Sequence, residues 1–300
     1  MSTPCAAFDP DGFDVRGTIA RLFVYPVKSC AGVEVREALL TETGLEFDRA
    51  WMVVDEAGVF VSQRELPRMA LIRPQMKQDE MVLRAPGMLA LHIAYDRVEA
   101  PAQATVWQDT VAAYDMGDVA AQWFSDCLSE PGRPRKLRLV RFDPGHKRLS
   151  SLKWTGGIEA EVQFADGYAL LVASEGSADE LNQRLAAAGH AAVGIERFRP
   201  NIVLAGVQAH DEDRAGMLHI GTAEGHAQLQ PVKPCTRCPM PDIDPATAIA
   251  SPEVGDTLRS YRADPRVDGA ITFGMNCIVR EGVEQVLKVG QAVGANLRFE

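Results

Sequence analysis

The sequence predicts an α/β (α+β) protein that is rich in β-barrel structure. Short apolar runs separated by turn-forming residues recur along most of the chain, and they are typical of short strands. Only a few stretches have the apolar period of a helix. A length of 300 residues is enough for one large domain or two modest ones, each with its own core. Many short strands with few helices favour a barrel that carries helical insertions.

The first half of the chain is expected to be mostly strands. A hairpin is expected where the turn sequence Asp55-Glu-Ala-Gly58 separates two apolar runs. Asp118 is expected to cap a helix that has Val119, Trp123 and Cys127 on one face. The other apolar runs predict strands at 18–27, 33–40, 51–54, 59–61, 81–84, 104–107, 111–114 and 136–141.

The second half begins with a polar, basic, glycine-bearing run at 144–157, which predicts a domain junction or a mobile loop over a pocket. Ser177 and Glu180 have the spacing of a capping box, and the helix that follows has Leu181 and Leu185 on its apolar stripe. Gly189 is expected to end this helix. Further patterns predict strands at 201–204, 218–221, 227–232, 272–279 and 286–289, and a short helix at 252–261.

Composition excludes some classes of function. A formal net charge of −10 argues against a nucleic-acid partner, because phosphate binding draws mainly on Lys and Arg. No apolar run approaches the roughly 18 residues that a membrane helix needs, so no membrane association is expected. The first residues contain neither the basic nor the apolar region of a secretory signal, which favours a cytoplasmic location.

Six cysteines are too dilute over 300 residues for a disulfide scaffold, and only Cys235 and Cys238 form a local group. A Cys-x-x-Cys pair could be half of a zinc site, a thioredoxin-type redox pair or two structural thiols. Zinc usually needs a second such pair or two suitably spaced histidines, and a redox pair opens a helix, which Pro239 and Pro241 disfavour. The spacing alone leaves the three alternatives open.

The residues next to the pair change this balance. Arg237 precedes Cys238 directly, and Lys233 is close in sequence. Cations beside a thiol favour the thiolate, which is the form that binds soft metals. They also suit an anionic cofactor, because phosphate is well bound by the paired N–H donors of arginine.

The segment Val232–Ala248, VKPCTRCPMPDIDPATA, resembles the molybdenum-ligand loop of the MOSC superfamily, and most closely its amidoxime-reducing branch. This superfamily is named after the C-terminal domain of molybdenum-cofactor sulfurase. The resemblance covers about residues 16–295. Other segments in the family's order are YPVKSC (25–30), GLEFDRAW (44–51), SQRELPRMALI (62–72), FADGYALLVASEGSADELNQRL (164–185), FRPNIV (198–203), TLRSYR (257–262), FGMN (273–276) and VGQAV (289–293).

The resemblance implies an N-terminal MOSC-type β-barrel domain at 16–140 and a MOSC domain at 158–297. It implies binding of the molybdenum cofactor, molybdenum held by molybdopterin, and chemistry that is independent of pyridoxal phosphate. The second cysteine of the loop, Cys238, corresponds to the protein ligand of the metal and to the catalytic residue. The residues implied to hold the phosphate and the pterin are Lys28, Ser29, Arg49, Asp166, Arg199, Thr236, Arg237 and Asn276.

Some of these residues also have simpler interpretations. Lys28 could be a solvated turn residue, although the adjacent hydroxyl group of Ser29 favours a phosphate site. Arg49 could form only a surface ion pair with its neighbour Asp48. Arg199 precedes a proline, which is expected to hold its backbone extended, and a buried structural arginine is the alternative there.

The chain departs from the family pattern at two places. Pro239–Asp242 replaces an apolar segment that often follows the ligand cysteine, and Met275 replaces a glutamine. Both changes affect the substrate more than the cofactor. Lys153 and Trp154 could line a substrate entrance, but a solvated loop is the simpler interpretation, and Asp244 is assigned no chemistry.

The implied activity is two-electron reduction of an N-hydroxylated compound or an N-oxide. No GxGxxG dinucleotide fingerprint follows any expected strand, and the cysteines do not suffice for an iron–sulfur cluster, so electrons are expected from a separate ferredoxin or flavoprotein. The C-terminal ferredoxin domain and the membrane anchor that some relatives carry are not expected here. The alternatives are a non-catalytic cofactor carrier or insertase, and a protein that carries sulfur on a cysteine.

Overall fold

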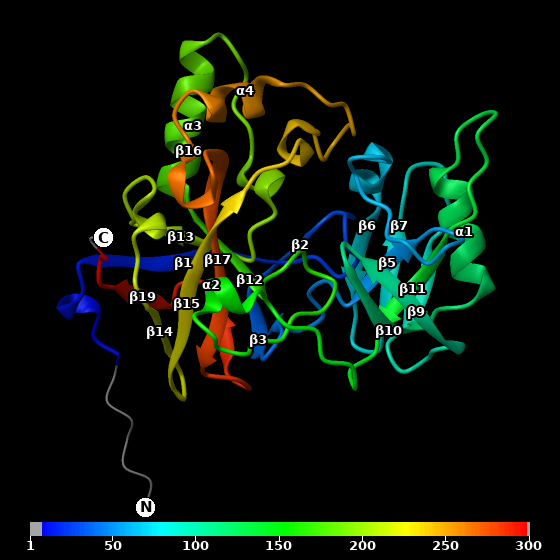
Figure 1. Cartoon of the computed structure of the whole chain (residues 1–300), viewed down its shortest axis with the longest axis horizontal. Helices are drawn as coiled ribbons and strands as arrows, with labels where there is room; N and C mark the ends of the chain where they lie inside the picture. The colour runs from blue at the N-terminus through cyan, green and yellow to red at the C-terminus, as the bar shows by residue number, and fades with distance from the viewer. Residues whose placement is uncertain (1–7, 299–300) are drawn as a thin grey trace, which may run out of the picture.

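The computed structural model describes residues 8–298, so Cys5 lies outside the described residues. Two lobes lie side by side (Figure 1). The larger lobe contains a β-barrel with helices α3 and α4 at one end, and the smaller lobe contains the sheets around β5 and β7 and helix α1. The polar run expected to join two domains passes between these lobes and contains the short helix α2.

The larger lobe is a closed barrel of seven strands. The first strand of the chain lies between two strands from its second half, and antiparallel pairing of β12 with β17 closes the ring. Around the ring the strands are β12 (Leu170–Ser174), β13 (Ile202–Ala205), β1 (Val15–Val24), β19 (Ala292–Ala295), β14 (Leu218–Thr222), β15 (Gly225–Thr236) and β17 (Ala270–Glu281). Two short strands extend it: β2 (Val33–Val35) pairs with β1, and β16 (Ala263–Asp264) pairs with β17.

The remaining strands form three smaller antiparallel sheets. The first contains β5 (Trp51–Val54), β11 (Arg138–Phe142), β10 (Asp109–Asp115) and β9 (Ala100–Val106). The second contains β6 (Arg73–Met76), β7 (Glu80–Arg84) and β8 (Leu91–Ala94). The third contains β18 (Val286–Lys288), β3 (Glu37–Thr41) and β4 (Gly44–Leu45).

The helices are α1 (Asp118–Leu128), α2 (Leu152–Thr155), α3 (Glu175–Ala187) and α4 (Glu253–Arg259). Single 3₁₀ turns are η1 (Pro10–Gly12), η2 (Pro67–Leu71), η3 (Ile195–Phe198), η4 (Asp211–Asp213), η5 (Met240–Asp242) and η6 (Pro265–Val267). Among residues 8–298, no helix is both long and apolar enough to cross a membrane.

Each lobe has its own apolar core. Leu22, Leu204 and Met275 belong to the cluster that fills the barrel, where alternate residues of each strand point inward. Trp51 and Phe124 belong to a separate cluster in the smaller lobe. These separate cores make the boundary between the lobes a place where polar groups can remain hydrated, and the pocket described below lies there.

The β-rich fold class expected from the sequence is confirmed. Most expected strands are present with their ends shifted by a few residues. The run expected as one strand at 33–40 divides at Arg36 into β2 and β3, and the second arm of the hairpin expected after Gly58 forms only isolated bridges. Six strands were not predicted: β6 contains Pro74, β4, β8 and β16 are short, and β19 consists of small residues. The sixth, β12, is buried along its whole length and therefore lacks an alternation of apolar and polar residues.

The predicted face and cap of α1 were wrong in part. Trp123 and Cys127 are buried as expected, but the Val119 side chain is 77% exposed, because the buried face includes Phe124 instead. Asp118 lies in the first turn and does not cap the helix; the N-cap position is Gly117 at φ 91°.

The predicted capping box of α3 was also wrong. The N-cap is Ser174, whose hydroxyl oxygen accepts from the Ser177 N–H, so the helix begins at Glu175, one turn earlier than expected. The Ser177 hydroxyl group instead donates to the buried carboxylate of Glu212 at 2.6 Å. The predicted apolar stripe is confirmed, since Leu181 and Leu185 are fully buried.

The buried face of α1 predicts an asymmetric effect of truncation. Phe124→Ala should lower the free energy of unfolding by about 3–5 kcal/mol, because it removes a fully buried ring and leaves a cavity. Val119→Ala on the same helix should change it by no more than about 0.5 kcal/mol. Urea titration of both variants measures this difference, and similar losses in the two would contradict the buried face described here.

Candidate functional site

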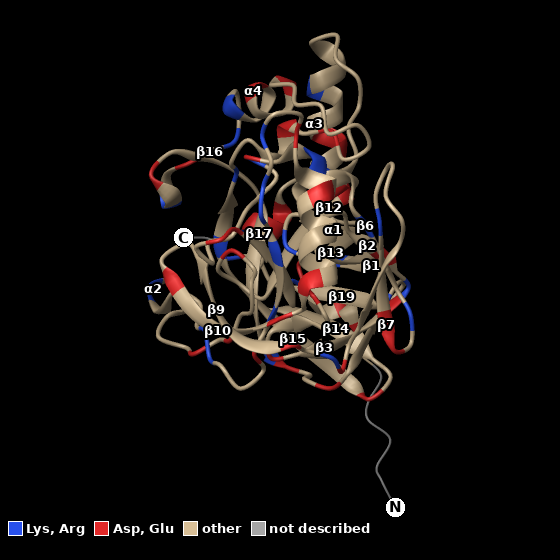
Figure 2. Cartoon of the chain, turned by 90° about the vertical axis from the view of Figure 1, so that its right-hand side faces the viewer, with Lys and Arg blue, Asp and Glu red and all other residues tan. Residues whose placement is uncertain are grey.

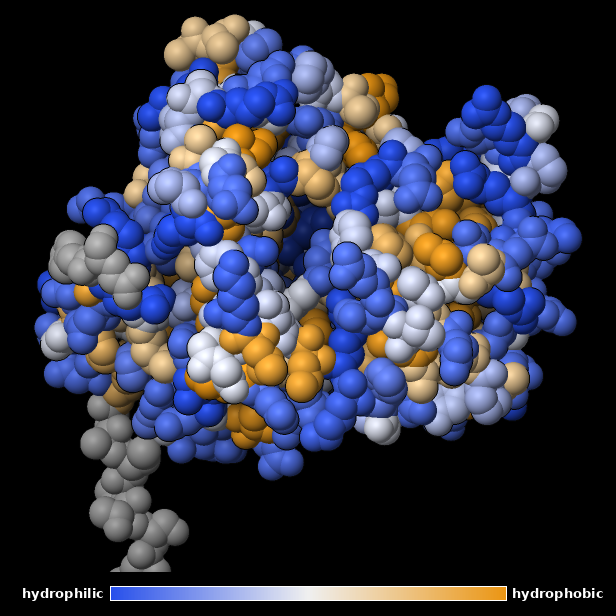
Figure 3. Space-filling view, in the orientation of Figure 1, coloured by the Kyte–Doolittle hydropathy of each residue, from blue (hydrophilic) through white to orange (hydrophobic). Residues whose placement is uncertain are grey.

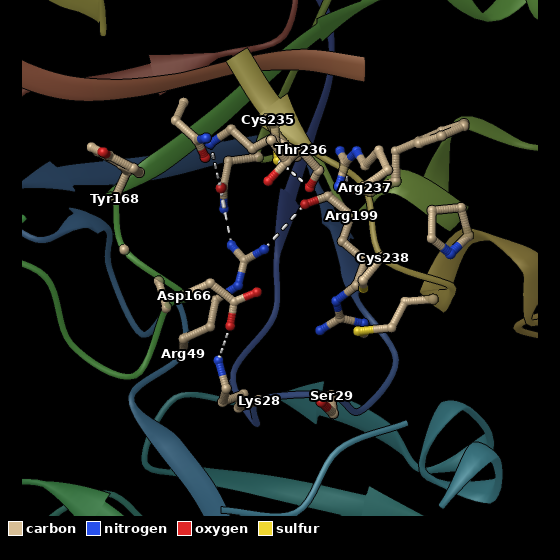
Figure 4. Close-up of a pocket in the computed structure, with 18 of the residues that line it drawn as sticks. Lys28, Ser29, Arg49, Asp166, Tyr168, Arg199, Cys235, Thr236, Arg237 and Cys238 are labelled. Atoms are coloured by element: carbon tan, nitrogen blue, oxygen red, sulfur yellow. Dashed lines mark hydrogen bonds and ion pairs between the residues drawn. The ribbon is translucent and has the colours of Figure 1, made fainter. Parts of the chain in front are cut away.

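A polar pocket lies between the two lobes. In Figure 3 it is the dark blue hollow near the centre of the molecular surface. All nine residues expected to bind the cofactor or the metal line it, and they come from both lobes: Lys28, Ser29, Arg49, Asp166, Arg199, Thr236, Arg237, Cys238 and Asn276. Figure 4 shows Lys28, Arg49 and Asp166 on one side of the cavity, with Arg237 and Cys238 facing them from the other.

Turns rather than strands supply most of these residues. Three of them, Ser29 at φ 66°, Arg49 at φ 50° and Arg199 at φ 57°, have left-handed backbone conformations that side-chain-bearing residues rarely adopt. The expected extended backbone of Arg199 was therefore wrong: this residue ends η3, and its N–H donates to the carbonyl of Glu196 at 3.0 Å. Such conformations cluster at functional sites, where surrounding contacts hold them in place.

Arg49 connects the two lobes. Its guanidinium forms an ion pair with Asp48 and donates to the Asn201 side-chain oxygen at 2.9 Å and to the Arg199 carbonyl at 3.1 Å. The pair is not the surface contact considered from the sequence, because the Asp48 side chain is 1% exposed and the Arg49 side chain 12%. Burial raises the pKa of Asp48, and the charge of Arg49 opposes this effect.

Lys28 and Asp166 form a second contact across the pocket. The Lys28 ammonium is buried, forms an ion pair with Asp166 and donates to the Phe164 carbonyl at 2.9 Å. Burial lowers the pKa of Lys28, and the charge of Asp166 offsets this only in part. For Asp166, desolvation raises the pKa, but the Lys28 charge and hydrogen bond outweigh it and hold that pKa below its usual range.

Arg199 and Arg237 are held by backbone carbonyls. Arg199 donates to the Cys30 carbonyl at 2.6 Å, and Arg237 donates to the Phe198 carbonyl at 3.0 Å. The Arg199 guanidinium also lies 4.2 Å from the centre of the Tyr25 ring, over its face. Burial, with the nearby charge of Arg49, lowers the pKa of Arg199 to about 10, so it remains a cation at neutral pH.

The lining of the pocket is strongly cationic although the chain as a whole is acidic. Six lining side chains are Lys or Arg and one, Asp166, is acidic. Within residues 8–298, Arg64, Arg199 and Arg237 form no ion pair with a carboxylate. Elsewhere, basic and acidic residues are scattered over many elements (Figure 2). This concentration of positive charge favours an anionic ligand.

The two neighbouring cysteines lie at the end of β15, and both line the pocket. Cys235 is the last but one residue of the strand, whereas Cys238 lies beyond its end, and each is partly exposed. Burial is the largest effect on Cys235 and raises the pKa of its thiol. In the part of the chain that the structure describes, no three His, Cys, Asp or Glu side chains are grouped so that they could hold a metal ion by themselves.

The pocket continues into a wider outer hollow. Cys238, Asp166 and Tyr168 line both spaces, and the outer one adds Trp107 and Leu149. Two residues considered for a substrate entrance lie elsewhere: Lys153 is exposed on α2, and Trp154 lines a separate cavity on the larger lobe. Asp244 forms an ion pair with Arg197 at 3.0 Å.

Several residues that contact the pocket lining were not identified from the sequence. Asn201 and Asp48 organise Arg49, and Trp107 donates its indole N–H to Asp166 at 3.2 Å. Asn201 and Asp48 lie in segments that resemble the family, so this resemblance could have identified them. Trp107 carried no sequence signal, because its place depends on a hairpin turn that approaches Asp166 only in the folded chain.

Taken together, the pocket can hold an anion against unpaired arginines while a thiol faces the same space. The buried Ser62 hydroxyl group also lines the pocket, and it has no hydrogen-bond partner among residues 8–298. A buried polar group without a partner is costly, so the cavity is suited to a ligand that can complete it.

Comparison with known proteins agrees with this geometry. The family described as "MOSC N-terminal beta barrel domain" matches residues 16–131, and the "MOSC domain" matches residues 159–294. Mouse mitochondrial amidoxime-reducing component 1 is 36% identical over 259 residues, which are 83% of this chain and 73% of that protein. Bovine mitochondrial amidoxime reducing component 2 is 33% identical over 289 residues, which are 92% of this chain and 82% of that protein.

A second group of relatives has a different name. Bovine molybdenum cofactor sulfurase is 31% identical over 273 residues, which are 86% of this chain but only 30% of the sulfurase. The two family domains and the extent of these matches agree on one assignment. The chain belongs to the MOSC-domain proteins that carry an N-terminal MOSC β-barrel domain, and it is related to the mitochondrial amidoxime-reducing components.

Proposed function

We propose that the protein binds the molybdenum cofactor in the pocket between its lobes and reduces N-hydroxylated compounds or N-oxides. The observation that carries the proposal is the charge of the pocket: six cations and one acid line it in a chain of net charge −10. The names of the amidoxime-reducing relatives supply the reaction class, and the molybdenum cofactor sulfurase relatives supply the cofactor class.

The residues of the pocket fit such a group. Arg199 and Arg237 present planar donors that are not occupied by any carboxylate of the described residues, and phosphate oxygens accept well from this geometry. The ammonium of Lys28 and the hydroxyl group of Ser29 would add a point charge and a further donor. Ser62, whose buried hydroxyl group lacks a partner, is a further candidate.

Other residues would hold the organic part of the cofactor. Asp166 is ionised at neutral pH and can accept from ring N–H groups, whereas Thr236 and Asn276 can donate or accept. Arg49 would stabilise the pocket from its position between Asp48 and Asn201. We further propose residues 16–140 and 158–297 as the two cofactor-binding domains.

Cys238 is the proposed protein ligand of the metal, because its thiol lies in the pocket beyond the end of β15. When bound, the cofactor would supply the two-electron chemistry that removes an oxygen atom from nitrogen. The chain would bind the anion, orient the substrate and limit the access of water. Reduction of R–NH–OH to R–NH₂ and water consumes two electrons and two protons, so a separate electron-donor protein, a ferredoxin or a flavoprotein, completes the proposal.

The ligand assignment predicts different effects of two neighbouring substitutions. Cys238→Ala should abolish turnover and thiolate coordination, because a methyl group cannot bind the metal. Cys235→Ala should retain both, at least in part. Molybdenum analysis, X-ray absorption at the metal edge and turnover of both variants provide the measurement. Equal loss in the two variants would favour a dithiol site and reject Cys238 as the sole ligand.

The arginine assignment predicts a loss of cofactor affinity. Arg199→Ala and Arg237→Ala should each weaken binding by about 10- to 100-fold, since each removes charge-assisted hydrogen bonds worth about 1.5–3 kcal/mol. Lysine at either position should restore affinity only in part, because the planar fork is lost. Arg16→Ala, in an exposed ion pair, is the matched control. Full molybdenum occupancy in both alanine variants would show that these arginines are structural.

The need for a separate donor predicts the following behaviour of the cofactor-loaded chain. Under anaerobic conditions, reduced methyl viologen should support reduction of a hydroxylamine or an amidoxime, and NADH or NADPH alone should not. Efficient turnover with NADPH alone would contradict the partner requirement. If viologen supports no turnover of several N-hydroxylated compounds, the cofactor-carrier alternative is favoured, and mass spectrometry for an added sulfur atom on Cys238 or Cys235 then tests the sulfur-carrier alternative.

A further inference from the structure

Trp107 has an unusual backbone conformation for so large a residue. It lies in the tight turn between β9 and β10 at φ 58°, in the left-handed region. Glycine, asparagine and aspartate normally occupy such positions, because a side chain there is strained. The strain points to a role for this side chain that a smaller residue would not fill.

The indole ring is held on several sides. Its N–H donates to an Asp166 side-chain oxygen at 3.2 Å, and the Arg64 guanidinium lies 4.6 Å from the ring centre, over its face. The Phe60 ring packs against it with the ring centres 5.0 Å apart. Despite these contacts Trp107 is 45% exposed, which leaves much of the indole open. An aromatic residue fixed in this way loses little conformational freedom when a ligand stacks on it.

Trp107 lines the outer hollow. Leu149, which is 38% exposed, and the partly buried Tyr168 line the same space. Cys238 lies where this hollow meets the cationic pocket, because it lines both. The outer hollow also has cationic lining residues, such as Arg148 and Lys233, but it differs from the inner pocket by the exposed apolar surface of Trp107 and Leu149.

We propose that Trp107 is a stacking platform that selects substrates with an aromatic ring attached to the N-hydroxylated group. This inference rests on the proposed function. The aromatic ring lies on the indole between Leu149 and Tyr168, and the nitrogen end of the substrate points toward Cys238. Trp107 acts through substrate affinity and takes no part in the redox step.

The test compares an aromatic and an aliphatic substrate of the same reaction class. In the molybdenum-loaded protein with reduced methyl viologen, Trp107→Ala should raise the KM for benzamidoxime about tenfold, as expected for loss of an aromatic stack. The KM for acetamidoxime should stay within about twofold, and any change in kcat that follows from loss of the hydrogen bond to Asp166 should be the same for both substrates. Trp107→Phe keeps a ring but loses the hydrogen bond to Asp166, and its KM for benzamidoxime should stay within about threefold of the natural protein.

A second measurement needs no turnover. Calorimetric titration of the molybdenum-loaded protein with benzamidine, the product, should show about tenfold weaker binding to Trp107→Ala. Trp154→Ala is the matched control, because this tryptophan is also partly exposed but lines a different cavity, and it should bind benzamidine like the natural protein.

These two measurements separate the platform from the reductase activity. If neither oxime is reduced but Trp107→Ala weakens benzamidine binding, the platform stands and the proposed reaction fails. If the oximes are reduced and Trp107→Ala changes both KM values equally or neither, the platform is rejected. Molybdenum content and the thermal unfolding midpoint of each variant check that the fold is intact.

Discussion

The hydrogen bond from Arg49 to Asn201 is the contact on which the pocket depends. Asn201 is 1% exposed, and its side-chain amide also accepts from the Leu171 N–H at 3.1 Å and donates to the Phe23 carbonyl at 3.2 Å. One amide therefore connects a turn near the smaller lobe with strands β1, β12 and β13 of the barrel. Losing it would leave several buried donors and acceptors without partners, which costs more than the hydrogen bonds themselves contribute.

The pocket depends on this contact because the positive charge of the pocket destabilises the folded protein. Within residues 8–298, Arg199 and Arg237 have no carboxylate partner, and Arg199 is buried close to the charge of Arg49. A desolvated charge of this kind destabilises a protein. Backbone carbonyls and the Tyr25 ring reduce the cost without neutralising the charge. A bound anion would reduce it further, so the strength of binding and the stability of the protein are linked through the same side chains.

Local patterns predicted much of the fold, and the failures have a common origin. Alternating apolar residues placed most strands, whereas the cap of α3 was missed because the Ser177 hydroxyl group binds Glu212, a residue 35 positions away. The residues proposed for the site line one pocket, and they could be chosen from the sequence because they lie in short motifs that resemble a known family. Asn201 was not assigned a role, since its contact with Arg49 spans 152 positions and exists only after the barrel has closed.

The order of strands around the barrel has a consequence for biosynthesis. Val15 at the start of β1 pairs with Ala295 in β19, and β1 also pairs with β13 at Leu22 and Ile202. A ribosome therefore releases β1 long before β13 and β19 exist, and only its last three residues can pair early, with β2. The rest of its hydrogen-bonding edges stay unpaired throughout most of translation, and closure of such distant pairs is slow. During this period an apolar strand is open to wrong pairing, so a nascent chain of this topology is a natural client for chaperones that shield strand edges.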